Sequence, residues 1–317
     1  MWIGLKPSRY LKKTAEEHIS WKIDINEAKN RIDKYYKVRS NRKDVEKRTE
    51  EADKSSVRIA EILGKSSFTF SPVELNNIHR RIFEGVFDSA GEFRNYDISK
   101  REWVLNGDTV LYSSFLDIKN NLEYDFEQEK NFLYEGLSLK EAIKHIARFI
   151  ANIWQIHPFG EGNTRTIAVF LIKYLRSFGF NIDDEIFAEN AWYFRNALVR
   201  ANYKNFSKNV LEDTYYLELF LENMITGSNH ELKNRYIHID YKDKKKVENS
   251  NKYSIEEQAI INLISSNSKI TQEEIAQSMN KSLRTIKSYM NKMQEKGIIK
   301  RENSKKNGEW NVLKKTN

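Results

Sequence analysis

A dense polar segment, HPFGEGNTR at residues 157–165, separates two strongly apolar stretches of the chain. His157 can accept a hydroxyl proton near neutral pH, because the ordinary pKa of histidine is about 6.5. Glu161 is a hard oxygen ligand of the kind that Mg²⁺ uses together with phosphates. Arg165 carries a forked cation that fits phosphate oxygens. Together these side chains predict chemistry in which part of a nucleotide moves to a hydroxyl.

The remaining residues of the segment suit a phosphate cradle. Gly160 and Gly162 permit backbone conformations that are closed to other residues. A glycine-containing loop that leads into a helix, expected to start near Thr164, exposes unpaired N–H groups at the positive end of the helix dipole. Asn163 can donate to a phosphoryl oxygen. We therefore predict an anion site at this helix start.

The flanking helices must hold this segment in place. Ile150, Ile153 and His157 are spaced i, i+3, i+7, so His157 extends the buried face of the preceding helix. Pro158 disfavours the α conformation at His157 and ends that helix. An ordinary structural role stays open for each residue taken alone, since a histidine on an apolar face is more often part of the core.

Residues 157–165 resemble the signature of the Fic family, H-x-F-x-(D/E)-G-N-x-R, without a gap. The resemblance extends over roughly residues 66–226, about half of the chain. It implies a helical Fic fold and, most commonly in the family, transfer of AMP from Mg-ATP to a Ser, Thr or Tyr hydroxyl. The cofactors it implies are ATP and Mg²⁺, and the partner is a protein substrate.

The resemblance also implies a role for each matching position. His157 would be the general base, Glu161 would hold Mg²⁺, and Arg165 would hold the β-phosphate. A target segment would pair with a hairpin flap at residues 98–112, where Asn106-Gly107 is a strong turn signal. The docking residues of that flap would be Val104, Leu105, Asn106 and Gly107. The nucleotide-binding residues would be Gly160, Gly162, Asn163, Thr164 and Arg165, with Tyr193 and Asn196 lining a nucleobase pocket.

The sequence departs from the family pattern at two positions of the motif region. The family usually has a second arginine, associated with the γ-phosphate, where this chain has Ala168. Thr164 stands where many members have glycine. The loss of the second arginine leaves open another nucleotide or phosphate-containing donor, or a kinase-like reaction on the same fold.

A self-inhibitory element is a further expectation from the resemblance. Many members carry (S/T)-x-x-x-E-(G/N) on a helix that obstructs the γ-phosphate site. The nearest candidates here are Ser56 with Glu61, one residue too far apart, and Thr214 with Glu218, which Leu219 follows. Each pair is also compatible with an ordinary helix surface.

The C-terminal quarter has its own composition and pattern. Residues 242–317 hold 17 Lys and Arg against 9 Asp and Glu, which accounts for the whole net charge of +8. A helix, a helix-turn-helix and two short strands around Asn307-Gly308 predict a winged helix. Its recognition helix would span 283–296. The predicted DNA-contacting residues are Arg284, Lys287, Ser288, Asn291, Lys305 and Lys306. Dimerisation, including a homodimer, and docking on the rest of the chain are the alternative uses.

The whole sequence predicts a mainly α protein, with a helical Fic fold and a small β-hairpin flap, followed by a winged helix-turn-helix domain. The expected parts are an N-terminal helical region (1–65), the Fic domain (66–228), a linker (229–252) with a short strand at 235–240, and the winged helix (253–317). Ser71-Pro72 predicts a helix start, and Gly64 predicts a helix end.

Composition excludes several classes of protein. The chain has no cysteine, so disulfides and thiolate metal sites are excluded. No signal-peptide or membrane-spanning segment is expected, so a cytoplasmic location without a membrane partner is predicted. The leading hypothesis is a protein adenylyltransferase. The alternative is a transcription regulator whose degenerate Fic domain senses a nucleotide.

Overall fold

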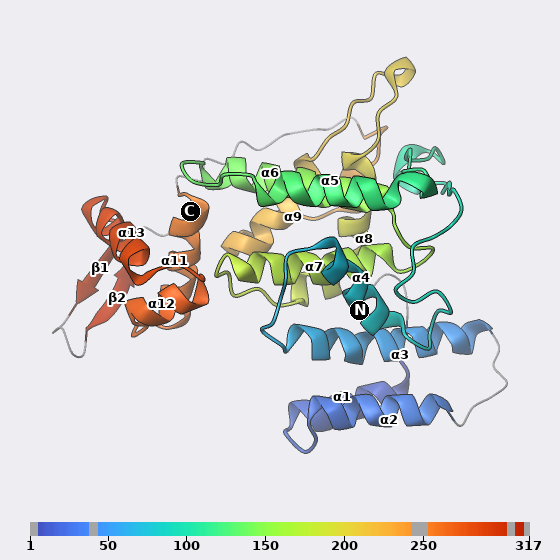
Figure 1. The fold of residues 1–317 in the computed structure, drawn as a ribbon, viewed down its shortest axis with the longest axis horizontal. Helices are drawn as coiled ribbons and strands as arrows, with labels where there is room; N and C mark the ends of the chain where they lie inside the picture. Colours follow the sequence, from blue (N-terminus) through green and yellow to red (C-terminus); the bar gives the residue numbers. More distant parts are fainter. Residues whose placement is uncertain (1–5, 38–43, 242–252, 303–307, 314–317) are drawn as a thin grey trace.

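The computed structural model describes residues 6–37, 44–241, 253–302 and 308–313. Helices dominate the described residues, which confirms the mainly α fold (Figure 1). The N-terminal helices are α1 (Arg9–Ile19), α2 (Ile25–Lys37) and α3 (Asp44–Leu63). The central helices are α4 (Pro72–Phe83), α5 (Ile118–Lys130), α6 (Leu139–Ile156), α7 (Asn163–Ser177), α8 (Glu185–Ala201), α9 (Tyr215–Thr226) and α10 (Asn234–Ile237). Short 3-10 turns are η1 (Trp103–Leu105), η2 (Phe115–Asp117) and η3 (Phe206–Lys208).

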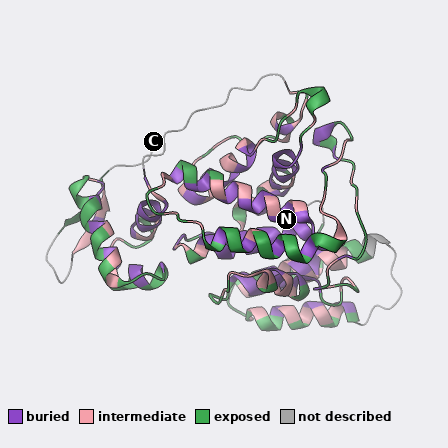
Figure 2. Ribbon diagram, turned by 45° about the horizontal axis from the view of Figure 1, so that its top comes forward, coloured by how far each residue is buried: buried purple, intermediate pink, exposed green. Residues whose placement is uncertain are grey.

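Helices α6 and α7 form the centre of the molecule. α6 starts at a capping box in which Ser138 and Glu141 satisfy each other's backbone N–H groups. Nearly every residue of α7 is buried, because α3, α4 and α6 pack around it. Figure 2 shows the burial concentrated in these central helices, while the outer helices carry exposed residues. The two helices therefore give the polar segment between them a rigid frame.

The predicted start of α4 and end of α3 are confirmed. The Ser71 hydroxyl accepts a hydrogen bond from the N–H of Glu74, and Pro72 occupies the first turn. α3 ends at Leu63, directly before Gly64. α3 packs against α2 on one side and against α4 and α7 on the other, so the N-terminal region is joined to the central helices.

The predicted flap at residues 98–112 is a loop rather than a β-hairpin. Asn106 and Gly107 both have positive φ, as the turn signal requires, and the N–H of Glu102 donates to Asp108 O at 2.9 Å. The flanking residues form no strand, because Val104 and Leu105 belong to η1 and are fully buried. Tertiary burial has overridden the β-forming character of these residues.

The expected strand at 235–240 is also wrong. Its first residues belong to α10, whose Ile237 is fully buried against the central helices. The N–H of Ile239 donates to Val104 O at 3.0 Å, so the segment is fixed to η1. Part of the predicted linker therefore belongs to the packed structure, whereas residues 242–252 lie outside the described ranges.

The C-terminal region is a winged helix-turn-helix, as predicted. It contains α11 (Ile255–Ser266), α12 (Gln272–Ser278) and α13 (Leu283–Glu295), followed by antiparallel strands β1 (Ile299–Glu302) and β2 (Glu309–Val312). This region packs on the central helices: Leu139 N donates to Tyr253 O at 2.6 Å, and the Asn262 amide donates to Ile225 O at 2.8 Å. No helix among those described combines the length and apolar character that a membrane span needs.

Candidate active site

His157 ends α6 in the left-handed conformation, with φ 49° and ψ 60°. This conformation is costly for a residue with a Cβ, and such strain is found where the surrounding structure enforces it. The imidazole Nδ1 lies 3.2 Å from Trp154 O, and Nε2 lies 3.2 Å from Lys100 Nζ. Because a carbonyl oxygen can only accept, Nδ1 carries the proton and Nε2 presents a lone pair.

The surroundings of His157 keep the ring neutral. The side chain is buried, and burial lowers its pKa well below the ordinary 6.5. The positive charge of Lys100 lowers the pKa further, as do Arg94 and Arg195. A neutral imidazole can act as a base across the physiological pH range once Lys100 Nζ moves away from the Nε2 lone pair.

The loop after His157 presents a run of unpaired N–H groups. Within the described residues, none of the backbone N–H groups of residues 160–165 donates a hydrogen bond. Gly162 caps α7 with φ 76° and supplies no capping side chain. A Cβ at Gly162 would lie 2.3 Å from the Phe83 ring, so only glycine fits this turn. The start of α7 is therefore an open anion site.

Asn163 and Thr164 hold the loop in shape. The Asn163 amide accepts from Phe159 N at 3.0 Å and donates to Phe159 O. The Thr164 hydroxyl accepts from the Trp154 indole N–H at 3.0 Å. Phe159 is buried, as an anchor should be. The amide predicted to meet phosphate thus has a structural role in this loop, and its phosphate contact stays a prediction.

His79 on α4 supports the loop, and this role was not predicted from the sequence. Its Nδ1 accepts from Gly91 N at 2.9 Å, so Nε2 carries the proton and donates to Glu161 O at 3.1 Å. The ring stacks on Phe159 with centroids 3.7 Å apart. Burial lowers the pKa of His79 to about 4, and the charge of Arg165 contributes. A histidine within the apolar stripe of α4 was the available signal.

Arg94 is a second supporting residue that sequence reasoning missed. Its guanidinium donates to the backbone oxygens of His157 at 2.8 Å, Tyr96 at 2.6 Å and Ser113 at 2.5 Å. The side chain is fully buried. Arg94 therefore ties both ends of the loop at 94–113 to the end of α6. It also places Lys100 and Tyr112 beside His157, and the Tyr112 ring centroid lies 4.7 Å from that of His157.

Arg165 is already engaged by the N-terminal region. Its guanidinium pairs with the Glu51 carboxylate and donates to the Ser55 hydroxyl at 3.3 Å, both on α3. It also lies 4.6 Å from the centroid of the Phe83 ring. A phosphate that binds Arg165 must displace or rearrange the Glu51 pair, because both anions compete for one guanidinium.

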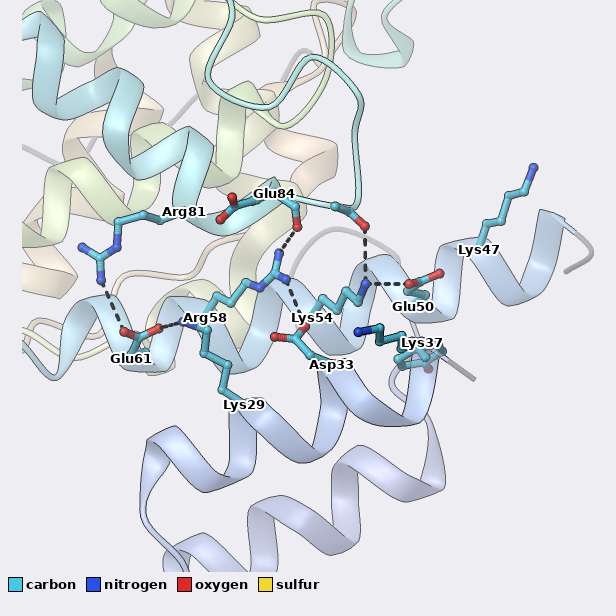
Figure 3. A pocket seen from close by; sticks show the side chains of 12 residues that line it. Lys29, Asp33, Lys37, Lys47, Glu50, Lys54, Arg58, Glu61, Arg81 and Glu84 are labelled. Atoms are coloured by element: carbon cyan, nitrogen blue, oxygen red, sulfur yellow. Dashed lines mark hydrogen bonds and ion pairs between the residues drawn. The ribbon is translucent and has the colours of Figure 1, made fainter. Parts of the chain in front are cut away.

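The self-inhibitory candidates from the sequence do not contact this arginine. Glu61 binds Lys29 at 2.9 Å and Lys65 at 2.7 Å, with Arg81 at 3.7 Å. Glu61 lines a charged cavity between α2, α3 and α4 (Figure 3). The volume of this cavity is about 710 Å³. Ser56 makes no hydrogen bond with Arg165, and the Thr214 hydroxyl donates to Glu218. The acidic residue on α3 that meets the motif is Glu51.

Glu161 is exposed beside the loop and is available to a cation. No group of three or more His, Asp or Glu side chains in the described ranges could hold a metal. One carboxylate with phosphate oxygens fits the way Mg²⁺ usually binds, so Glu161 is compatible with Mg²⁺ only when a nucleotide is also present. Ala168 is buried in α7 and offers no cation.

The remaining predicted nucleotide and flap residues lie in packed surroundings. Tyr193 is buried, and its hydroxyl has no hydrogen-bond partner among the described residues. The Asn196 amide donates to Asn234 at 2.7 Å. Neither side chain hydrogen-bonds to residues 157–165 in the described structure, so their role stays a prediction. Val104 and Leu105 are buried, which leaves Asn106 and Gly107 as the exposed residues of the predicted flap tip.

The predicted DNA-contacting face of α13 is exposed. Arg284, Lys287, Ser288 and Asn291 all face solvent, while Ile286, Met290 and Met293 are buried. Lys305 and Lys306 lie outside the described residues. The described part of the wing adds the exposed Lys300 and Arg301.

Two family models match separate segments of the chain. The Fic/DOC family model matches residues 69–175, and a winged helix-turn-helix DNA-binding model matches residues 257–300. The protein adenylyltransferase VbhT of Bartonella schoenbuchensis is 27% identical over 123 residues, which is 38% of this chain and 24% of that protein. The probable protein adenylyltransferase y4lH of Sinorhizobium fredii is 31% identical over 108 residues, 34% of this chain and 53% of that protein.

These similarities are partial. The matched segments span about a quarter and about half of the two relatives. Among solved structures, the N-terminal Fic domain of the Bep8 protein from Bartonella sp. 1-1C has a TM-score of 0.43 and 21% identity, covering 58% of this chain and 87% of that one.

Proposed function

We propose that this chain, in which a Fic/DOC domain precedes a winged helix, is a transferase that moves AMP from ATP to a hydroxyl of a target protein. The observation that carries the proposal is the neutral His157 beside a helix start with unpaired N–H groups. The first feature suits proton abstraction and the second suits phosphate binding. The protein adenylyltransferases among the relatives support the choice of AMP.

The residues present suit each part of the reaction. The backbone N–H groups of residues 160–165 would bind the phosphates, and Arg165 would add a cation. Glu161 would hold Mg²⁺, which when bound neutralises phosphate charge. His157 Nε2 takes the proton of the target hydroxyl. The hydroxyl oxygen bonds to the α-phosphorus as the bond from that phosphorus to pyrophosphate breaks.

Two groups must rearrange before this chemistry. The Glu51 carboxylate pairs with Arg165, and Lys100 Nζ lies against the Nε2 atom that would take the proton. Because Ala168 stands in place of the second arginine, the site has one cationic phosphate donor fewer than the family pattern. Slow turnover in the resting protein follows from these features.

The test uses ATP labelled on the α-phosphate, Mg²⁺ and a cell lysate. Label that stays on protein and disappears with His157→Ala supports the proposal. The absence of His157-dependent label with every nucleotide tried would overturn it. ATP labelled on the γ-phosphate separates AMP transfer from the kinase-like alternative.

A second candidate function is regulation of transcription through DNA binding, favoured by the exposed face of α13. In this account the Fic domain senses a nucleotide, and the buried Ala168 removes a catalytic contact. A sensor does not need a base. His157→Ala would then leave nucleotide binding and DNA binding unchanged, and no label would form with the wild type.

A further inference from the structure

A second cavity is lined by Tyr112, whose ring also contacts His157. It has a volume of about 350 Å³ and lies where α5, α6 and the loop at residues 111–113 meet. Its α5 wall is Asn121, Tyr124 and Asp125, and its α6 wall is Asn152, Gln155 and Ile156. We call this cavity the Asp125 pocket. Its size is within the range of pockets that hold a ligand group.

Asp125 is the only charged residue in the lining of the pocket. No hydrogen bond or ion pair reaches its carboxylate from any described residue. Burial alone raises its pKa to about 6, so the carboxylate is partly desolvated without a compensating partner. A partly buried carboxylate without a cation is unfavourable unless a ligand supplies one.

Two amides in the pocket lining have carbonyl oxygens that are available as acceptors. The Asn121 amide uses its N–H to bind the Ser113 hydroxyl at 2.7 Å. The Gln155 amide uses its N–H to bind Leu111 O at 2.9 Å. Their carbonyl oxygens accept no hydrogen bond from the described residues. The rings of Tyr112 and Tyr124 add aromatic surface, which attracts a cation.

The pocket is close to the reacting centre. Tyr112 lines it and also contacts His157, with ring centroids 4.7 Å apart. Ile156 precedes His157 directly in the chain. The loop between them is fixed, because Arg94 and Gln155 bind the backbone at residues 111–113. A peptide with its hydroxyl at Nε2 can therefore place a neighbouring side chain in this pocket.

We propose that the Asp125 pocket binds a lysine or arginine side chain of the target protein, next to the hydroxyl that is modified. This inference rests on the proposed function, because it names the class of target. An ammonium or guanidinium group supplies donors for the carboxylate and the amide oxygens together. An acidic neighbour would meet the Asp125 charge and be excluded.

Peptide binding without ATP tests the inference separately from the reaction. Short fluorescent peptides carry one central serine and lysine, methionine or glutamate at the flanking positions, and polarisation measures their affinity for the full chain. We expect the lysine peptides to bind at least about tenfold more tightly than the methionine peptides, as a charge-assisted contact provides. Equal affinities across the series would overturn the proposal.

Two variants on α5 identify the group responsible. Asp125→Asn should remove the preference for lysine, and Asp125→Lys should reverse it towards glutamate. The matched control is Glu123→Gln, which removes the same charge from an exposed position of α5 outside the pocket. A preference that survives Asp125→Asn, or that Glu123→Gln abolishes equally, contradicts the proposal.

The same peptides with α-labelled ATP then distinguish the two hypotheses. Lysine-selective binding without any transfer would contradict the proposed function and leave the cation-binding pocket standing. Transfer without selectivity would contradict the pocket and leave the function standing.

Discussion

His157 combines two properties that a general base needs. Its Nδ1 is fixed on Trp154 O, and its burial keeps the ring neutral. The left-handed backbone at this residue allows the helix to end while the ring stays inside the core. The cost of that conformation is offset by the buried contacts of Arg94 and Phe159 around it.

The first prediction concerns the pH dependence of transfer. Since the pKa of His157 is lowered, the neutral base persists as pH falls below the ordinary histidine value of 6.5. The measured kcat/KM should stay level from about pH 8 to about pH 6. The measurement is kcat/KM in a series of buffers at constant ionic strength. A fall in kcat/KM centred near pH 6.5 would show that the ring titrates normally and would contradict this prediction.

The second prediction concerns the stability cost of Asp125. Its pKa is raised from 3.8 to about 6, so the folded state holds its proton more tightly and loses stability as pH rises through this range. Asp125→Asn should therefore stabilise the protein at pH 7 by about 1 kcal/mol, after allowance for solvent in the pocket. The gain should vanish near pH 4. Urea unfolding at both pH values measures it, and a loss of stability at pH 7 would mean that the carboxylate has a structural partner.

At this scale the sequence predicted the residues of the motif but not their supports. His157, Glu161 and Arg165 lie within nine residues of the chain, and their types and spacing predict their chemistry. His79, Arg94 and Glu51 act through contacts across long sequence distances, such as Glu51 with Arg165. No local pattern encodes such a pair, and Glu61 only approximates the spacing of the inhibitory pattern, lying one residue too far from Ser56.

Helix α3 links the N-terminal region to the motif at residues 157–165. One part of it holds Arg165 through Glu51 and Ser55, and another part binds α2 through Glu61 and Lys29. α3 therefore pairs with Arg165 of the motif, and its charged contacts with α2 hold the helix in that position.

The third prediction tests whether α3 inhibits the transfer reaction. Glu51→Gln should free Arg165 for phosphate and raise the rate of AMP transfer several-fold, with a lower KM for ATP. Glu61→Gln is the matched control on the same helix, since Glu61 binds Lys29 and Lys65 instead. A steady-state assay of labelled product compares them. If Glu51→Gln is slower than the wild type while remaining folded, the pair is part of the working site.

Elements with strong local signals were predicted correctly. The Ser71 cap of α4 and the end of α3 at Leu63 follow from capping chemistry. The predictions of a hairpin flap and of a strand at 235–240 were wrong for one shared reason. Residues 104–105 and 237–239 pack on each other. Local propensity cannot report a contact between segments so far apart.

At the scale of the whole molecule, the winged helix is docked on the central helices yet keeps its basic face free. Leu139 and Tyr253 join the two regions, and α13 faces solvent with Arg284 and Lys287. Docking and DNA binding are therefore compatible in one structure.

The fourth prediction concerns DNA. The full chain should bind duplex DNA with an affinity that falls steeply with salt, because phosphate neutralisation releases counterions. Arg284→Ala with Lys287→Ala should reduce the slope of log affinity against log salt by about 2. The control pair is Lys269→Ala with Lys296→Ala, since Lys269 pairs with Glu309 and Lys296 with Glu257. Fluorescence anisotropy at several salt concentrations measures the slopes, and unchanged slopes would remove α13 from the interface.

The most direct test of the central claim uses the Glu51→Gln protein with two forms of labelled ATP. If residues 157–165 transfer AMP, protein should retain label from the α-phosphate and none from the γ-phosphate. Adding His157→Ala to the same protein should abolish the label while the fold is kept. Label retained from the γ-phosphate, or α-label that survives the loss of His157, would contradict the account.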